Sequence, residues 1–211
     1  MRPVLRNAIE REEFDYQVLK SALADYASPR DRITALLRSG EIVRVKKGLY
    51  VFGAPYRRRP VCRELLANLM YGPSIVSLDY ALAYRGLIPE RVDSVTSVTT
   101  GRPRTFDTPL GRFVYRPTPC LDAGLDRVTD ESGSFLIATA ERALADRIRD
   151  DRGGPLTTTG AMKDYLLFNL RISTEDLVKL DPHRLRDLAI RLKSTKVDVC
   201  ARTIAALQRG R

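Results

Sequence analysis

The stretch Gly40–Phe52, GEIVRVKKGLYVF, contains two β-rich runs on either side of a single glycine. The run EIVRV alternates apolar and charged side chains, as a half-buried strand does. Lys46, Lys47 and Gly48 then form a short connection, in which glycine supplies the positive φ that a tight hairpin needs. The run GLYVF follows as the second strand. The stretch therefore predicts a β-hairpin with cations at its tip.

The residues before this hairpin predict a capped helix. In ASPRDRITALLRSG, residues 27–40, Ser28 is a good N-cap and Pro29 suits the first helical position. Asp31 lies three residues after Ser28, which resembles a capping box with Asp in place of Glu. Gly40 suits the left-handed position that ends a helix. The apolar positions of the helix recur at helical spacing: Ile33, Leu36 and Leu37.

Two shorter helical patterns precede the capped helix, over residues 4–12 and 15–26. Helix, helix, capped helix and hairpin is the order of a winged helix-turn-helix. In that architecture the capped helix enters the major groove and the hairpin, or wing, contacts the DNA backbone. We therefore expect a DNA-binding unit whose candidate residues are Arg30, Arg32, Thr34, Arg38, Arg44, Lys46 and Lys47.

The apolar stripe assigns roles to these residues. Arg30 and Thr34 lie near the start of the capped helix, the end that reaches base edges, and Arg32 lies near the boundary of the buried face. The other cations are better placed for phosphates, where they add salt-dependent affinity. The alternative is a plain hairpin after helices, with charges that only keep the surface soluble.

The distribution of charge agrees with a basic footprint at the chain ends. The net charge of the 211 residues is +10. Residues 1–59 carry 13 Lys/Arg and 7 Asp/Glu, residues 60–155 carry 12 and 13, and residues 156–211 carry 11 and 6. Basic ends suit a polyanionic partner, although solvated helix faces produce similar counts.

The fold class that we predict is α+β. We expect three parts along the chain, with a linker between the first and the second. Residues 1–55 form the winged helix-turn-helix, residues 61–155 a small α+β unit with few strands, and residues 156–211 a helical segment. The linker, residues 56–60, is bracketed by prolines. Its arginines are either further phosphate contacts or a solvated run: Arg57, Arg58 and Arg59.

Signals of catalysis are weak. The three cysteines are far apart, His183 is the only histidine, and no phosphate-binding loop or dinucleotide fingerprint occurs, so we expect no metal site and no cofactor. Glu141 and Asp146 are five residues apart and do not share a helix face, so we expect Glu141 to pair with an arginine or cap its helix. No apolar run approaches the roughly 18 residues of a membrane span. The N-terminus lacks the apolar stretch of a signal peptide, so we expect a cytoplasmic protein without membrane contact.

Three segments in order carry a family resemblance: IVRVKKGLYVF, GPSIVSLDYALAYRGLIPE with the following VTSVTT, and ATAERALADRI. Over residues 10–150 the chain resembles the AbiEi antitoxins of abortive-infection (phage-defence) toxin–antitoxin systems. The resemblance implies a transcriptional autorepressor that binds inverted repeats upstream of its own operon through the winged domain. It also implies a remainder that counteracts a nucleotidyltransferase-like toxin, without a stable complex with it.

Two other readings stay open. The first is a nucleic-acid-modifying enzyme, such as a nuclease, with the winged domain as its targeting module; metal-dependent cleavage lost on changing Glu141 or Asp146 would favour it. The second is a protein-interaction scaffold whose basic ends bind an acidic partner, which indifference to DNA at physiological salt would favour.

Overall fold

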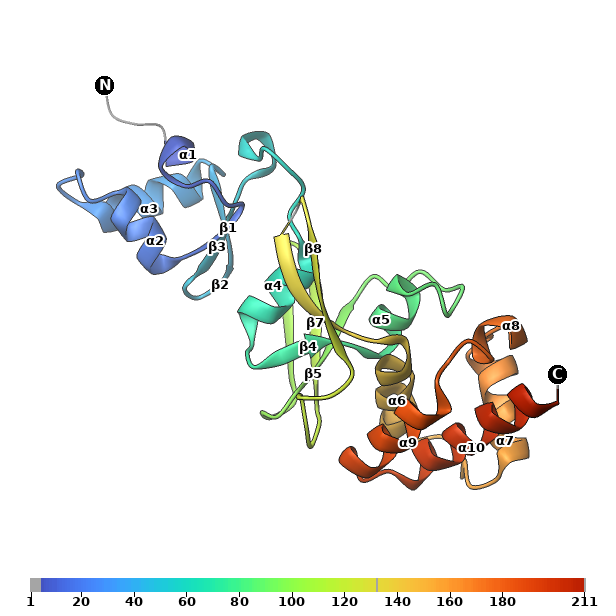
Figure 1. Ribbon diagram of the computed structural model, residues 1–211. Helices are drawn as coiled ribbons and strands as arrows, with labels where there is room; N and C mark the ends of the chain where they lie inside the picture. The colour runs from blue at the N-terminus through green and yellow to red at the C-terminus, as the bar shows by residue number, and fades with distance from the viewer. Residues whose placement is uncertain (1–4, 132, 211) are drawn as a thin grey trace.

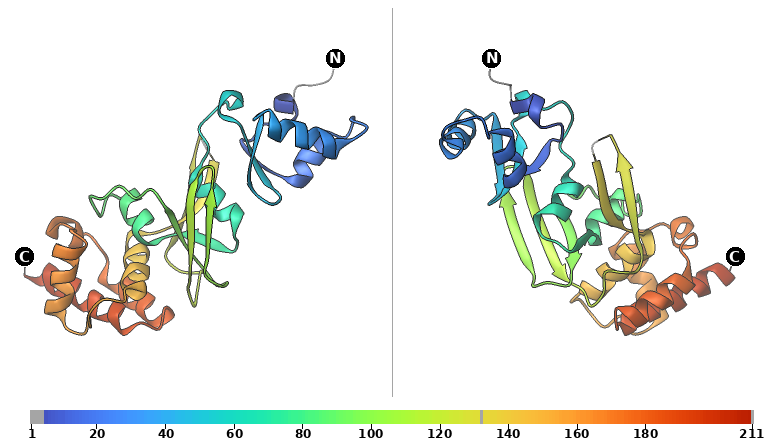
Figure 2. Two further views of the ribbon diagram at one scale, coloured as in Figure 1. Left: turned by 180° about the vertical axis from the view of Figure 1, so that it is seen from behind. Right: turned by 60° about the vertical axis from the view of Figure 1, so that its left-hand side comes forward.

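The computed structural model describes residues 5–131 and 133–210, and it is a mixed α+β protein with a helical C-terminal part (Figure 1). The N-terminal unit and the C-terminal helices lie at opposite ends of the molecule, with a large sheet between them. The views in Figure 2 show the same order of parts. The α+β class and the helical C-terminal part that the sequence predicts are therefore confirmed.

Three helices and a small antiparallel sheet make up the N-terminal unit. Its strands have the order β1-β3-β2, so β3 lies between the other two and pairs with both of them. Gly48, with φ of +85°, turns the chain between β2 and β3, as the sequence predicts. The elements are α1 (Leu5–Ala8), β1 (Glu13–Asp15), α2 (Tyr16–Ala22), α3 (Pro29–Arg38), β2 (Ile42–Lys46) and β3 (Leu49–Phe52).

Strand β3 is buried on both faces, which explains why its sequence is entirely apolar. Tyr50 and Phe52 pack with the three helices in one core. Leu49 and Val51 point the other way, since successive side chains of a strand alternate, and join the main core of the molecule. The outer face of the hairpin therefore packs against the next unit.

A six-stranded mixed sheet forms the centre of the molecule, in the order β6-β7-β5-β4-β9-β8. Helix α4 packs against β4, β5 and β9, and the Tyr115 hydroxyl of β7 donates to the Ala67 carbonyl of α4 at 2.7 Å. Helix α5 packs against β5 and α6. The elements are α4 (Arg63–Met70), β4 (Ser74–Val76), α5 (Leu78–Tyr84), β5 (Val95–Thr99), β6 (Arg104–Thr108), β7 (Gly111–Pro117), β8 (Leu125–Asp130), β9 (Gly133–Ala138) and α6 (Ala140–Asp150).

The C-terminal helices pack around α6. Helices α9 and α10 contact it directly, and α10 also packs on α7 and α8. Asp181 caps α9 by accepting from the backbone N–H groups of His183 and Arg184, as its position before Pro182 indicates. The elements are α7 (Thr159–Asp164), a π-helical turn (Tyr165–Asn169), α8 (Thr174–Leu177), α9 (Pro182–Arg191) and α10 (Thr195–Arg209).

The structure also departs from the sequence predictions at several elements. Residues 13–15 form β1, a strand that the sequence does not predict. The helix expected over residues 4–12 is reduced to Leu5–Ala8, with Val4 outside the described residues, and the helix expected over residues 15–26 to Tyr16–Ala22. Strands β4 and β8 are additional, so the middle unit has more strands than expected. Ser28 occupies the N-cap of α3, but its side chain makes no capping hydrogen bond, so the predicted capping box does not form.

No helix among residues 5–131 and 133–210 combines the length and apolarity needed to cross a membrane.

Candidate nucleic-acid interface

Helix α3 presents a cationic face because its apolar side chains are committed to the N-terminal core. Ile33 and Leu36 are buried between α3 and the sheet. With these two residues inward, Arg30, Thr34 and Arg38 are exposed on the outer side. These three residues therefore share one accessible helix face, as the sequence predicts.

The first turn of α3 also borders a hollow. The space has a volume of about 340 Å³ and is lined by residues of α2 and by the start of α3, among them Lys20 and Arg30. The Thr34 hydroxyl, one turn further on, donates to the Arg30 carbonyl at 3.1 Å and keeps its oxygen lone pairs free to accept. Lys20 is a cation that the sequence analysis missed, because only contact with α3 brings α2 into this region.

Arg32 differs from the other α3 cations because it braces the unit. Its guanidinium lies 5.5 Å from the Tyr26 ring centroid, within the range of a cation–π contact. Its Nη2 atom lies 4.0 Å from Glu41 Oε2 at the start of the hairpin. Arg32 is half-buried, in agreement with its predicted place at the edge of the apolar stripe.

The hairpin contributes two exposed cations. Arg44 projects from β2 with its guanidinium 5.9 Å from the Tyr50 ring centroid, and Lys47 lies in the turn beside Gly48. The strand register shifts between Arg44 and Lys46, so the hairpin is irregular next to its tip. Arg44 and Lys47 therefore point away from the fold.

Lys46 is not grouped with these exposed residues. Its ammonium donates to the Met70 carbonyl at the end of α4, and the side chain is half-buried. Burial lowers the pKa of Lys46, and the positive charge of Arg104 lowers it further. Lys46 therefore joins the hairpin to the middle unit, a role that only the long-range packing reveals.

The three linker arginines are hydrogen-bonded to the fold, although the Arg58 side chain is exposed and donates to Asn7 Oδ1 at 3.3 Å. Arg57 Nε donates to the Phe52 carbonyl at 2.8 Å, and Arg59 Nη1 donates to the Glu131 carbonyl at 2.7 Å. Arg58 donates through its backbone N–H to Glu12 Oε1 at 3.1 Å. The segment predicted as the linker is thus hydrogen-bonded to the units on both sides of it.

Two buried carboxylates, Glu12 and Glu13, accept hydrogen bonds from backbone N–H groups in and just after this segment. Glu12 forms an ion pair with the buried Arg6, and Glu13 Oε1 accepts from the Cys62 backbone N–H at 3.0 Å. Burial raises the pKa of Glu13. The sequence predicts Glu12 at the end of the first helix and Glu13 between the first two helices, and a cluster of charges near an N-terminus gives no sign of burial.

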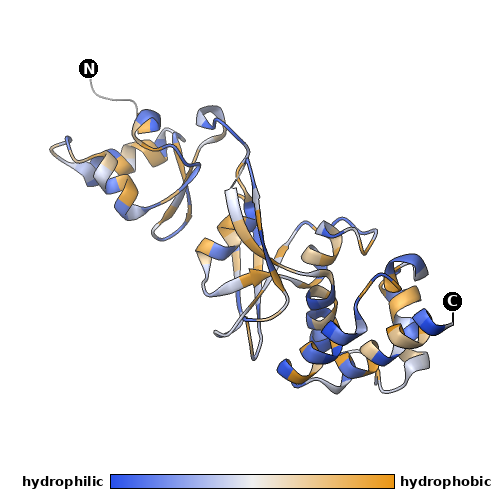
Figure 3. Cartoon of the chain, in the orientation of Figure 1, coloured by the Kyte–Doolittle hydropathy of each residue, from blue (hydrophilic) through white to orange (hydrophobic). Residues whose placement is uncertain are grey.

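The carboxylates considered for nuclease chemistry are used by the fold. Asp146 Oδ2 accepts from Arg142 Nε at 2.8 Å and from the Ser77 hydroxyl at 2.7 Å. Glu141 Oε1 accepts from the Asp181 backbone N–H at 3.2 Å, so it supports the start of α9 and pairs with no arginine of its own helix. Figure 3 shows hydrophilic residues along α6. Three charged residues of this helix are buried: Glu141, Arg142 and Asp146.

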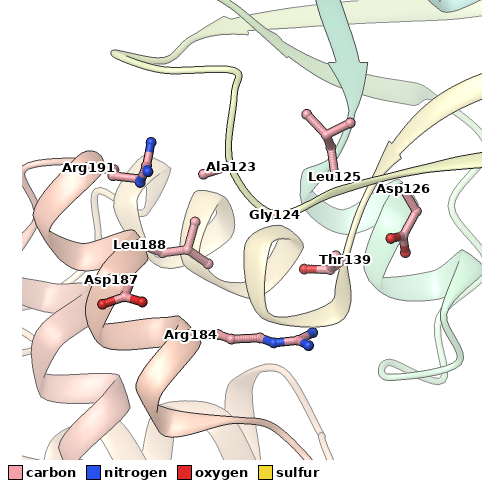
Figure 4. Close-up of a pocket in the computed structure, with 9 residues that line it drawn as sticks. All are labelled: Ala123, Gly124, Leu125, Asp126, Thr139, Arg184, Asp187, Leu188 and Arg191. Carbon is pink, nitrogen blue, oxygen red and sulfur yellow. The ribbon is translucent and has the colours of Figure 1, made fainter.

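A cleft of about 370 Å³ lies between α9, the segment around Gly124 and the start of α6 (Figure 4). Three of its four charged residues form ion pairs: Asp126 accepts from Arg85 at 2.7 Å, Arg191 lies 3.1 Å from Asp122, and Arg184 lies 3.6 Å from Asp181. Across residues 5–131 and 133–210, no group of three or more His, Cys, Asp or Glu side chains is placed to hold a metal ion. The cleft therefore offers paired charges rather than a convergent set of catalytic groups.

The histidine and the cysteines take structural positions. His183 is exposed in the first turn of α9, where its backbone N–H donates to Asp181. Cys62 and Cys200 are buried, and burial raises the pKa of the Cys200 thiol to about 12.

Comparison with protein-family models gives no match, and comparison with curated proteins gives none either. Among solved structures, the chain is similar to one described as the crystal structure of the RV2827C protein from Mycobacterium tuberculosis. The TM-score is 0.55 at 15% sequence identity, and the match covers 99% of this chain and 83% of that chain. A likeness at this identity establishes a shared fold over the length of the chain.

Proposed function

We propose that the N-terminal unit is a winged helix-turn-helix and that the protein binds double-stranded DNA through it. The observation that carries this proposal is the exposed cationic face of α3 beside the hairpin, on a unit whose hairpin packs against the middle unit through Leu49 and Val51. Three helices with a sheet in the order β1-β3-β2 provide the parts that this class of DNA-binding unit uses.

In this proposal α3 lies in the major groove. Arg30, in its first turn, reaches the O6 and N7 atoms of a guanine, and the Thr34 hydroxyl contacts a neighbouring base edge. Arg38, Arg44 and Lys47 contact phosphates, which fix the register of the helix without reading sequence. Lys46 holds the hairpin against α4, so the wing enters the complex already positioned.

Within this class, the particular function that we propose is that of an AbiEi-like antitoxin. The protein represses its own operon by binding inverted repeats with two copies, and it counteracts a nucleotidyltransferase-like toxin in the cytoplasm without catalysis of its own. Two of the segments that carry the resemblance meet in the fold. Ser77 of SIVSLDYAL donates to Asp146 of TAERALAD, so these segments form one buried unit.

Protection of DNA from nuclease digestion tests the DNA-binding part. We expect the full chain to protect two half-sites, about 10 base pairs apart or a multiple of that, in the DNA upstream of its own gene. Arg30→Gln should remove this protection, whereas Arg186→Gln, at an exposed site on α9, should leave it intact. Equal protection by both variants would contradict the placement of α3.

Co-expression tests the antitoxin part. Cells that express a nucleotidyltransferase-like toxin encoded beside this gene should grow when the full chain is co-expressed. The Arg30→Gln variant should rescue growth equally well, because the proposed toxin-directed part lies outside the DNA-binding unit. Failure of the full chain to rescue growth would reject the antitoxin proposal and leave DNA binding to be judged separately.

A further inference from the structure

The hairpin tip and the start of β6 meet at the end of α4. Lys46 of the hairpin donates its ammonium to the Met70 carbonyl. The next residue, Tyr71, has the Arg104 guanidinium 5.3 Å from its ring centroid. Cations from two segments that are almost 60 residues apart in sequence therefore flank two consecutive residues of α4's C-terminal end.

The turn before β6 is fixed on the same tyrosine. A Cβ atom on Gly101 would lie 2.6 Å from the Tyr71 hydroxyl oxygen, so the turn lies directly against the end of this side chain. Thr99 accepts from the Gly101 backbone N–H at 3.1 Å and holds the turn from its other side. Arg102 follows directly and is exposed, as is Arg104. The fold therefore places both arginines beside the wing on a braced turn.

The charge of this region is not compensated within the described residues. Nearby acids have other partners: Asp107 binds Arg112 at 2.8 Å, and Glu41 faces Arg32. None of the ion pairs between residues of the described ranges includes Lys47, Arg102 or Arg104.

Like charges at short range repel each other, and the proximity of Arg104 lowers the pKa of Lys46. The free protein therefore contains electrostatic repulsion between Lys46 and Arg104, and a bound polyanion reduces it.

We propose that Arg102 and Arg104 contact the phosphate backbone of the duplex that α3 reads, so that the DNA-binding surface continues from the wing onto the central sheet. We call Lys47, Arg102 and Arg104 the wing–strand surface. The inference rests on the proposed function, because it uses the same duplex. Adjacent phosphates of one strand are about 3.4 Å apart along the axis, so cations on two neighbouring elements meet successive phosphates.

A phosphate backbone suits this surface better than an acidic protein does. Stable protein interfaces have an apolar centre with a polar rim, whereas phosphate contacts are made by separate basic side chains. The wing–strand surface consists of lysine and arginine from a turn and a strand end, which matches the second pattern.

The test is a salt series of binding with the full chain. The probe is a labelled duplex of about 30 base pairs from the DNA upstream of the gene, long enough for two half-sites. Arg102→Gln/Arg104→Gln is compared with Arg127→Gln/Arg186→Gln, which removes the same charge from exposed positions on β8, at the opposite edge of the sheet, and on α9.

We expect the first variant to lower the slope of log K against log salt by about 1.8, because each phosphate contact contributes about 0.9. At about 0.1 M salt this corresponds to roughly eightfold weaker binding for each lost contact. The control variant should keep the slope of the unchanged protein. Arg102→Lys/Arg104→Lys should restore most of the slope, which a loss of shape alone would not do.

The outcomes separate this inference from the proposed function. If the unchanged protein binds the duplex, Arg30→Gln weakens binding, and Arg102→Gln/Arg104→Gln matches its control, the wing–strand surface is wrong and the winged helix stands. If the unchanged protein shows no salt-dependent binding, both fall. If the same arginine variant weakens binding of polyglutamate but not of the duplex, the surface serves an acidic protein and the inference is overturned.

Discussion

The buried guanidinium of Arg142 ties the segment of residues 118–123 to helix α6. Its side chain is 0% exposed. It donates to Asp146 Oδ2 at 2.8 Å, to the Ala123 carbonyl at 2.8 Å, to the Cys120 carbonyl at 2.9 Å and to the Thr118 hydroxyl at 3.0 Å. Replacing it with methionine keeps an unbranched stem about as long as the arginine stem up to Nε and removes every donor.

The free-energy cost of Arg142→Met follows from these contacts. Breaking a buried ion pair by removing one partner costs about 3–5 kcal/mol, because the other charge stays buried and unpaired. Each orphaned acceptor adds about 1–3 kcal/mol, although such penalties are not additive. We expect a total of about 5 kcal/mol. Because domains of this size lose about 2–4 °C in Tm per kcal/mol, Tm should fall by roughly 10–20 °C.

Chemical denaturation followed by far-ultraviolet circular dichroism measures this loss, since the chain has no tryptophan to report by fluorescence. The control is Arg202→Met on α10, which removes an exposed ion pair with Asp198 at 3.1 Å and should cost no more than about 1 kcal/mol. Arg142→Met/Asp146→Leu should be more stable than Arg142→Met alone, because no unpaired charge remains. The reasoning fails if Arg142→Met costs no more than Arg202→Met.

Three further results are expected. Gly124→Ala should destabilise the protein by about 2–4 kcal/mol in thermal denaturation, because φ is +65° and the new Cβ would lie 2.7 Å from Cβ of the buried Arg142. The control Gly154→Ala has open space around the new Cβ and should cost under about 1 kcal/mol. Equal costs for the two variants would refute the packing argument. Burial raises the pKa of Glu13 above its ordinary 4.5, so its contribution to stability is present at acidic pH and is lost as pH rises through the folded value. Glu13→Gln should therefore gain stability relative to the unchanged protein as pH rises from 4.5, and a constant difference would contradict this sign. Lys47→Gln should lower the salt slope of DNA binding by about 0.9, because Lys47 is exposed in the hairpin turn. Lys46→Gln should change the slope less, because the Lys46 ammonium already donates to the Met70 carbonyl. A larger effect for Lys46 would contradict the assignment of Lys47, and not Lys46, as the phosphate contact.

Local signals in the sequence were sufficient for the hairpin and for α3. Gly48 supplies the positive φ, Pro29 occupies the first helical position and Gly40 adopts φ of +72° after the helix, and each acts within a few residues of its own position. Such signals need no knowledge of the rest of the chain. They also gave the exposed face of α3, because Ile33 and Leu36 define it.

Long-range pairing set the parts that the sequence did not reveal. Strand β1 is three residues long and exists because it pairs with β3, while β8 is an edge strand with mostly polar residues. Arg142 resembles a surface residue of an amphipathic helix until the segment around Gly124 closes over it. Lys46 resembles a wing residue until α4 is placed beside the hairpin. For β1, Arg142 and Lys46 the deciding partner lies far away in the chain, whereas β8 pairs with the strand that directly follows it and is hidden in the sequence by its polar residues.

The most direct test of the account is the affinity of the full chain for the DNA upstream of its own gene, against a scrambled duplex, across a salt series. The account predicts tight and sequence-selective binding with a steep salt dependence, because α3 reads bases while several cations hold phosphates. Weak binding that is equal for both duplexes would contradict the recognition role of α3. It would leave a basic protein whose partner is an acidic protein surface.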